Sequence, residues 1–128
     1  MIVLDTHAWI WWVGESPDLS RRAKQAIAKA DEIGVHAISC WEVAMLVSRK
    51  RLGLSMDVDD WIGEALRYPK VTLLPLEPSA AVLATRLPGS FHNDPADRFI
   101  VSTCLSHGAP LVTKDRRIHD WRQIPVIW

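Results

Sequence analysis

The chain begins Met1-Ile2-Val3-Leu4-Asp5-Thr6-His7, a short apolar run that ends at a carboxylate. Short, continuous apolar runs are typical of parallel strands that are buried on both faces. Similar runs return at residues 35–38, 71–76, 111–113 and 126–127. Because segments with helical spacing separate these runs, the sequence predicts an α/β fold whose mostly parallel sheet is covered by helices on both faces.

The segments between the predicted strands carry the start and stop signals of helices. Ala8–Val13 is apolar throughout and ends at Gly14, which predicts a short helix that is buried on most sides. Further helices are predicted after Ser20, from Ser39 to the basic cluster 49–51, over 57–66, over 78–87 and from Asp94 to Gly108, and residues 114–123 are predicted to be a loop or a short helix. No linker or internal repeat divides the chain, so 1–128 is predicted to be a single domain.

Composition limits the class of protein. With 48% hydrophobic and 23% charged residues, the chain has the balance of a globular protein and not of a disordered one. Its longest purely apolar run, Ala8–Val13, is far shorter than the ~20 residues of a membrane helix, and no basic segment precedes the first strand as in a signal peptide. Cys40 and Cys104 form no C-x-x-C pair, so neither a disulfide framework nor a zinc knuckle is expected. We therefore expect a cytoplasmic protein with no membrane association.

Charge gives no direct argument for a nucleic-acid partner. Lys and Arg total 15, and Asp and Glu also total 15, so the formal net charge is zero. The distribution is uneven, because residues 52–97 are acidic overall and residues 98–128 are basic. This pattern fits either a dipolar surface or acidic side chains that are gathered for a chemical purpose.

The acidic residues fall where an open parallel sheet binds its ligands, beyond the carboxyl ends of the strands. Asp5 ends the first strand, Glu42 lies in the first turn after the second, Asp94 and Asp97 flank the start of the long helix, and Asp115 follows the fourth strand. Carboxylates ~5 Å apart repel one another by roughly 3 kcal/mol per pair at an effective dielectric of ~20. A cluster of them therefore needs a cation, and hard oxygen ligands suit Mg²⁺ or Mn²⁺. Two such ions can stabilise the attacking and leaving oxygens of a phosphodiester.

Taken singly, most of these acids have a structural alternative. Ser39 and Glu42 have the spacing of a capping box. Asp94 before Pro95 has the form of an N-cap, with Asp97 as a first-turn acid that the helix dipole favours. Asp115 fits a turn or an ion pair. Asp5 is the exception, because a carboxylate directly after a buried strand has no evident capping role.

Aromatic residues and histidines leave two further questions open. Trp9, Trp11 and Trp12 crowd one short helix, where they fit either core packing or a groove for a partner protein. His7 and His92 lie nearest the acids in sequence, although a histidine in a loop or at a helix start is more often structural.

Four blocks of the sequence resemble the PIN-domain ribonucleases, especially the VapC-type toxins of toxin–antitoxin pairs. These blocks are residues 1–7, Ile38-Ser39-Cys40-Trp41-Glu42-Val43, His92-Asn93-Asp94-Pro95-Ala96-Asp97-Arg98-Phe99-Ile100-Val101 and Leu111-Val112-Thr113-Lys114-Asp115. They occur in the family's order over the whole chain. Ala96 stands where the family usually has an aromatic residue, which affects local packing and not the chemistry.

The resemblance implies a PIN-like three-layer α/β/α fold and an Mg²⁺- or Mn²⁺-dependent endoribonuclease in which activated water attacks an RNA phosphodiester. It also implies a homodimer and a VapB-type antitoxin that inhibits the toxin in a hetero-oligomer. By position, the family's acidic quartet is Asp5, Glu42, Asp97 and Asp115, with Asp5 and Asp97 as the first choice of metal ligands, Asp94 as an accessory acid, and Thr6 and Thr113 as neighbouring hydroxyls. Arg98, Lys114, Arg116 and Arg117 border this site and are candidates for contacts with RNA phosphates, or else form a solvated face that pairs with the acids.

Two other functions compete with this interpretation. A phosphorylation-controlled receiver domain has a similar length and an acidic Mg²⁺ pocket, but its middle strand ends in an aspartate, and Val71–Leu76 has none. A PIN-like module that binds RNA or protein without cutting is the other alternative. The retention of all four acids argues against it, because a binding module gains nothing from their mutual repulsion.

Overall fold

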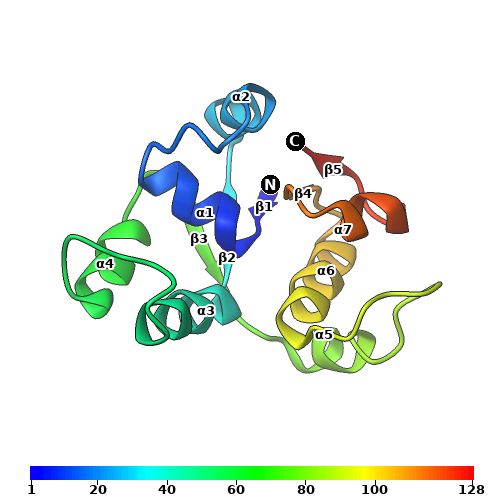
Figure 1. Ribbon diagram of the computed structural model, residues 1–128. Helices are drawn as coiled ribbons and strands as arrows, with labels where there is room; N and C mark the ends of the chain where they lie inside the picture. The colour runs from blue at the N-terminus through cyan, green and yellow to red at the C-terminus, as the bar shows by residue number, and fades with distance from the viewer.

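The computed structural model describes residues 1–128, in which five short strands alternate with helices (Figure 1). The strands are β1 (Ile2–Leu4), β2 (Ile33–His36), β3 (Val71–Leu74), β4 (Leu111–Val112) and β5 (Val126–Ile127). They form one sheet in the order β3-β2-β1-β4-β5, and every neighbouring pair is parallel. The predicted parallel sheet is therefore confirmed, with β1 at its centre.

Seven helices cover the two faces of this sheet. They are α1 (Thr6–Val13), α2 (Arg21–Lys29), α3 (Ala37–Ser48), α4 (Val58–Ala65), α5 (Pro78–Leu83), α6 (Pro95–His107) and α7 (Arg116–Trp121). Helices α1 to α4 lie on one side of the strands, and α5 to α7 lie on the other (Figure 1). This arrangement is the predicted three-layer α/β/α fold.

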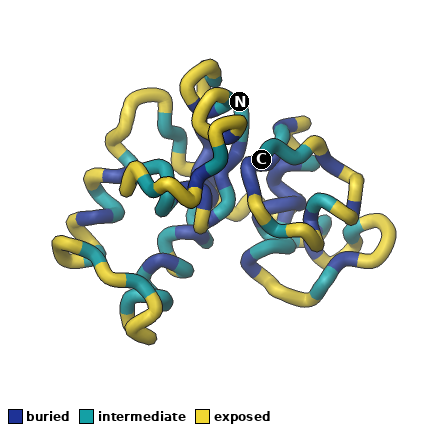
Figure 2. The backbone as a smooth tube through the Cα atoms, turned by 45° about the horizontal axis from the view of Figure 1, so that its top comes forward, coloured by how far each residue is buried: buried dark blue, intermediate teal, exposed yellow.

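A hydrophobic core lies on each face of the sheet, between the strands and the helices. Successive strand residues point to opposite faces, so each strand contributes to both cores. Leu4 of β1 is fully buried among side chains of the first four helices, including Trp9. Its neighbour Val3 is buried on the other face, with Ile100 of α6 and Ile118 of α7. The buried stretches of the chain accordingly lie along the strands and the inner sides of the helices (Figure 2).

The second strand begins and ends two residues earlier than predicted. Gly34 conceals its start in the sequence, because a glycine weakens the apolar pattern of a strand. The glycine leaves room for a neighbour, since a β-carbon there would lie 2.7 Å from Leu74 Cδ1 on the next strand and would force that side chain to shift. Helix α3 therefore begins at Ala37 and not at Ser39, and its N-cap is His36, whose Nδ1 accepts a hydrogen bond from the Ile38 backbone at 3.0 Å.

The other predicted elements are present with small shifts. Helix α1 begins at Thr6, directly after Asp5, and so starts two residues earlier than predicted. The third and fourth strands are shorter than predicted, the helix from Pro78 ends at Leu83, and a helix forms within 114–123. None of the helices is long and apolar enough to cross a membrane.

Candidate active site

A polar pocket of about 530 Å³ lies at the carboxyl-terminal edge of the sheet. The parallel strands β1 and β4 both end at this edge, α6 reaches it with its first turn, and α3 reaches it with Glu42 in its second turn. Ten residues line the pocket: Asp5, Thr6, His7, Trp11, Glu42, Asp94, Asp97, Lys114, Asp115 and Arg117. The structure thus brings together all five acids that the sequence analysis selected.

Three of these acids cap helices that begin at the pocket. Asp5 Oδ1 accepts the Ala8 amide of α1 at 2.8 Å, Asp94 Oδ1 accepts the Ala96 amide of α6 at 3.0 Å, and Asp115 Oδ1 accepts the Arg117 amide of α7 at 2.9 Å. The expectation that Asp5 has no capping role is therefore wrong, because α1 starts immediately after β1 and leaves its first amides unpaired. The capping alternative holds for Asp94, and the ion-pair alternative holds for Asp115, which pairs with Arg117 at 2.9 Å. Both coexist with the place of these acids in the pocket wall.

Glu42 is positioned by side chains and not by a capping box. Ser39 lies inside α3 and is fully buried, so it cannot cap the helix. Its hydroxyl lies 2.8 Å from the Thr6 hydroxyl, and Thr6 in turn donates a hydrogen bond to Glu42 Oε1. The capping-box interpretation of Ser39 and Glu42 is therefore wrong, and Thr6 holds the carboxylate at the pocket.

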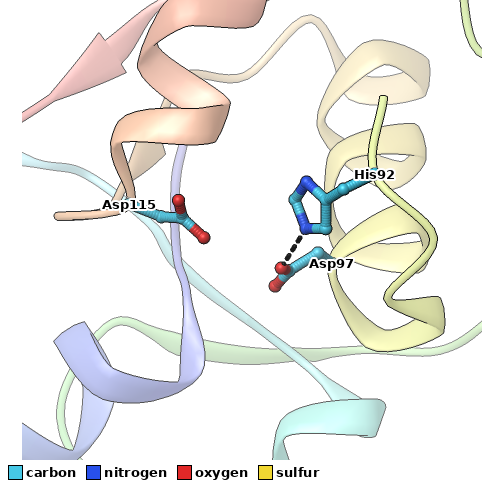
Figure 3. A group of neighbouring side chains, drawn as sticks. All are labelled: His92, Asp97 and Asp115. Carbon is cyan, nitrogen blue, oxygen red and sulfur yellow. Dashed lines mark hydrogen bonds and ion pairs between the residues drawn. The ribbon is translucent and has the colours of Figure 1, made fainter. Parts of the chain in front are cut away.

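His92, which is not part of the pocket lining, forms a close group with the two lining acids Asp97 and Asp115. His92 Nε2 lies 2.6 Å from Asp97 Oδ2, and one ligand atom from each of the three residues lies within 4.8 Å of the others. Figure 3 shows the carboxylates of Asp97 and Asp115 and the His92 ring converging on the same space. The sequence analysis left His92 as a structural residue, although its place five residues before Asp97 was the available signal.

Burial raises the pKa of the acids that lie deepest. The pKa of Asp5 is raised to about 6, chiefly by burial, against hydrogen bonds from Thr113 and the Ala8 amide. Burial also raises the pKa of Glu42 to about 7, despite the hydrogen bond from Thr6, and nearby acids add to the rise. Burial likewise raises the pKa of Asp97, although His92 opposes it. The pocket lining holds five carboxyl groups against the two cations Lys114 and Arg117.

Asp115 differs because a cation faces it. Burial alone would raise its pKa, but hydrogen bonds from the Arg117 side chain and backbone outweigh burial and hold it below the usual value. The Arg117 guanidinium lies at 2.9 Å from Asp115 and at 3.7 Å from Asp97.

A family model described as the PIN domain matches residues 2–123. The chain belongs to the PIN-domain family. It is 43% identical to Ribonuclease VapC22 of Mycobacterium tuberculosis over 121 residues, which cover 94% of this chain and 92% of that protein. This identity places it with the VapC-type members of the family. A receiver domain is thereby excluded.

Solved structures share the fold. VapBC2 from Rickettsia felis, bound to a DNA fragment from its promoter, aligns with a TM-score of 0.71 and 17% identity over 98% of this chain and 97% of that one. A toxin–antitoxin complex from Klebsiella pneumoniae aligns with a TM-score of 0.67 and 20% identity over 100% of this chain and 97% of that one. At such identities these structures support the PIN fold alone.

The four basic residues that the sequence offered as RNA-phosphate contacts divide into two groups. Lys114 and Arg117 line the pocket, whereas Arg98 and Arg116 do not. Arg98 donates hydrogen bonds to the carbonyls of His92, Ala84 and Phe91 at 2.7 to 2.9 Å, so its guanidinium is engaged in holding the segment before α6. This contact set gives Arg98 a structural role in place of the phosphate contact considered from the sequence.

Proposed function

We propose that this PIN domain is a divalent-metal-dependent endoribonuclease, a hydrolase that acts as the toxin of a toxin–antitoxin pair. The observation that carries the proposal is the convergence of Asp5, Glu42, Asp97 and Asp115 on one pocket at the end of the sheet. The ribonuclease name of the 43% identical relative supports the reaction and the RNA substrate.

The donor set fits Mg²⁺ or Mn²⁺. All the acids offer hard carboxylate oxygens, and five of them line a pocket whose cations are Lys114 and Arg117. Asp5 and Asp97 are the proposed direct ligands, with Glu42 and Asp115 completing the set and Asp94 as an accessory. A bound divalent ion would supply positive charge for the reacting phosphate and lower the pKa of a water.

The chain's own groups have distinct tasks in this proposal. Thr6 orients Glu42, and the buried Thr113 hydroxyl hydrogen-bonds Asp5 and accepts the Asp115 amide at 3.0 Å. Glu42 completes the ligand set or orients the attacking water. Lys114 and Arg117 stand at the wall of the pocket, where they can neutralise RNA phosphates.

The decisive experiment maps the 5′ ends of cellular RNA after brief expression of the chain, with Asp5→Asn as the control. Asparagine caps helices as well as aspartate, so this variant keeps the start of α1 and removes one ligand charge. We expect new 5′ ends with the wild-type chain and none with Asp5→Asn. The purified protein should cut the same sites with Mg²⁺ or Mn²⁺ and stop in excess chelator. Binding of RNA without cleavage would favour the non-catalytic PIN-like module instead.

A cognate VapB-type antitoxin is the proposed inhibitor, because the solved relatives include VapBC and toxin–antitoxin complexes. An acidic pocket favours a cationic side chain, so we propose that the antitoxin inserts Arg or Lys near Asp5 and Asp97 and covers α1. Antitoxin affinity should fall in an Asp97→Asn, Trp11→Ala double variant, and an unchanged affinity would refute this contact.

We also propose that the chain is a homodimer in the cytoplasm. Trp41, Leu73 and Val82 are large apolar side chains with exposed fractions of 56%, 48% and 49%, and we propose that they belong to the dimer interface. Free Cys40 and Cys104 are in keeping with a reducing compartment. Sedimentation of the purified chain and fractionation of cells test these two points.

A further inference from the structure

Trp11 is the one large apolar side chain in the wall of the acidic pocket. Its helix, α1, carries it from the carboxyl end of β1, so the indole lies beside the acids. The same side chain also borders an apolar cleft of about 560 Å³ between α1 and α2. Trp11 therefore separates a polar reaction pocket from an apolar cleft.

The surroundings of Trp11 differ from those of the other tryptophans in α1. Trp9 is fully buried and packs edge-on against Trp61, with 5.0 Å between ring centroids. Trp12 packs against Tyr68, with 5.3 Å between ring centroids, and lines the apolar cleft but not the acidic pocket. Trp11 instead lies among His7, whose ring is 5.6 Å away, Trp128 at 5.8 Å, and Lys114.

Lys114 places a positive charge over the Trp11 ring. Its Nζ lies 5.9 Å from the ring centroid, which is a cation–π contact, and Lys114 lines the same pocket. Lysine has a long, flexible side chain, so a phosphate in the pocket can attract the ammonium away from the indole. The movement would leave an aromatic face bordered by an exposed histidine, His7, next to the acids.

We infer that Trp11, with His7 at its edge, is a stacking platform for one unpaired nucleobase next to the cleaved bond. This inference rests on the proposed function and adds a residue that would hold the RNA beside the cleaved bond. A base in a duplex is stacked on both sides, whereas an unpaired base can stack on an aromatic side chain. Stacking of this kind tolerates any base, so the platform selects unpaired nucleotides and not a sequence.

The test is a double-mutant cycle that combines protein variants with RNAs that lack one base. Fluorescein-labelled 12-nucleotide single-stranded RNAs carry the mapped cleavage site, intact or with an abasic nucleotide on either side of the cleaved bond. Binding is measured by anisotropy, and single-turnover cleavage gives a half-saturation concentration and a maximal rate. The variants are Trp11→Leu, Trp11→Phe as the conservative aromatic replacement, and Trp12→Leu as the matched control in the same helix.

We expect Trp11→Leu to weaken binding of the intact RNA by about ten-fold or more, since aromatic stacking on a base is worth that much. Trp11→Phe should recover most of the loss. One abasic position should weaken binding to the wild type and to Trp12→Leu, yet have no further effect on Trp11→Leu. Mn²⁺ affinity, measured by calorimetry, should be the same in all variants, which establishes that the pocket is folded.

An equal effect of the abasic nucleotide on wild type and Trp11→Leu would overturn the platform. So would a Trp11→Leu variant that loses only antitoxin binding, because Trp11 would then be a protein-docking residue. A wild type that binds these RNAs without cutting them would refute the proposed function, while the same binding cycle would still decide the role of Trp11.

Discussion

Arg117 donates two side-chain hydrogen bonds to Asp115. Its Nε lies 3.2 Å from Asp115 Oδ1, and its Nη2 lies 2.9 Å from Oδ2. The same Nη2 is 3.7 Å from Asp97 Oδ2, so one guanidinium faces two of the proposed ligands. The arginine side chain is 60% exposed, so it is free to turn away from both. Arg117 thus stands where it competes with a metal ion for these carboxylates.

Arg117→Gln should therefore tighten metal binding. Exposed ion pairs contribute at most about 1 kcal/mol, so we expect the Mn²⁺ dissociation constant to fall by up to about five-fold. Cleavage at saturating metal should fall, because a cation that faces RNA phosphates is lost. Calorimetry and a cleavage assay measure the two effects. Arg116→Gln is the matched control, since Arg116 is the neighbour of Arg117 in α7 and lies outside the pocket lining. Equal metal affinity in both variants would contradict the competition.

The sequence predicted the sheet and the acids well, and for a physical reason. Buried parallel strands need continuous apolar runs. The end of each run therefore shows which residue lies at the carboxyl-terminal edge of the sheet. Asp5 and Asp115 were therefore placed at the same edge by the alternation of strands and helices alone. Asp94 was predicted as the N-cap of α6 from its position before Pro95, and the hydrogen bond to the Ala96 amide confirms it.

The features that were missed depend on contacts between distant segments. Gly34 concealed the start of β2 because its role is to leave room for Leu74, forty residues further along the chain. Ser39 has the local pattern of a cap, yet its hydroxyl pairs with that of Thr6 in α1, thirty-three residues earlier in the chain. Arg98 lies next to the acids in sequence, but three backbone carbonyls of the preceding segment hold its guanidinium. The spacing of residues within one segment cannot predict such contacts with distant segments.

Stability without metal should depend on pH through Glu42. Its pKa in the folded chain is about 7 against an ordinary 4.5, so the folded state holds a proton that the unfolded chain has released. The folded state therefore loses stability as pH rises from about 4.5 to about 7. Glu42→Gln removes this loss, so its melting temperature should exceed that of the wild type by a margin that grows between pH 5 and pH 8. Thermal melts in chelator measure the margin.

His36 also changes stability with pH, which is why the wild type is compared with Glu42→Gln and not considered by itself. Burial lowers its pKa to about 4, so its contribution to stability rises with pH, opposite to that of Glu42. Both proteins contain His36, and its effect cancels in the difference between them. Added Mn²⁺ should reverse the order above pH 7, because the ion stabilises the wild-type site. A margin that stays constant with pH would mean that Glu42 titrates normally.

Thr6→Val should weaken metal binding at neutral pH without changing the shape of the pocket. Valine has nearly the shape of threonine but no hydroxyl, so Glu42 loses a hydrogen bond that lowers its pKa. The pH at which Mn²⁺ binding is half-maximal should rise. The buried Ser39 hydroxyl loses its partner as well, which should cost about 1 kcal/mol of unfolding free energy. Thr103→Val is the control, because that buried hydroxyl bonds only the Phe99 carbonyl within α6. A shift of the same size in both variants would mean that Thr6 is only structural.

Asp94 and Asp97 test the distinction between a cap and a ligand, since both line the pocket at the start of α6. Serine caps helices about as well as aspartate, so Asp94→Ser should keep the hydrogen bond to the Ala96 amide and cost well under ~1 kcal/mol of stability. Asp97→Asn removes one charge from a carboxylate whose pKa burial has raised, so the metal-free protein should be as stable as the wild type or more so. We expect Asp97→Asn to abolish RNA cleavage and to weaken Mn²⁺ binding, and Asp94→Ser to leave cleavage reduced but measurable. Cleavage assays with calorimetry and thermal melts on both variants measure these effects. Loss of cleavage in Asp94→Ser while Asp97→Asn still cuts would reverse the two roles, because the helix cap would then be the residue that binds the metal.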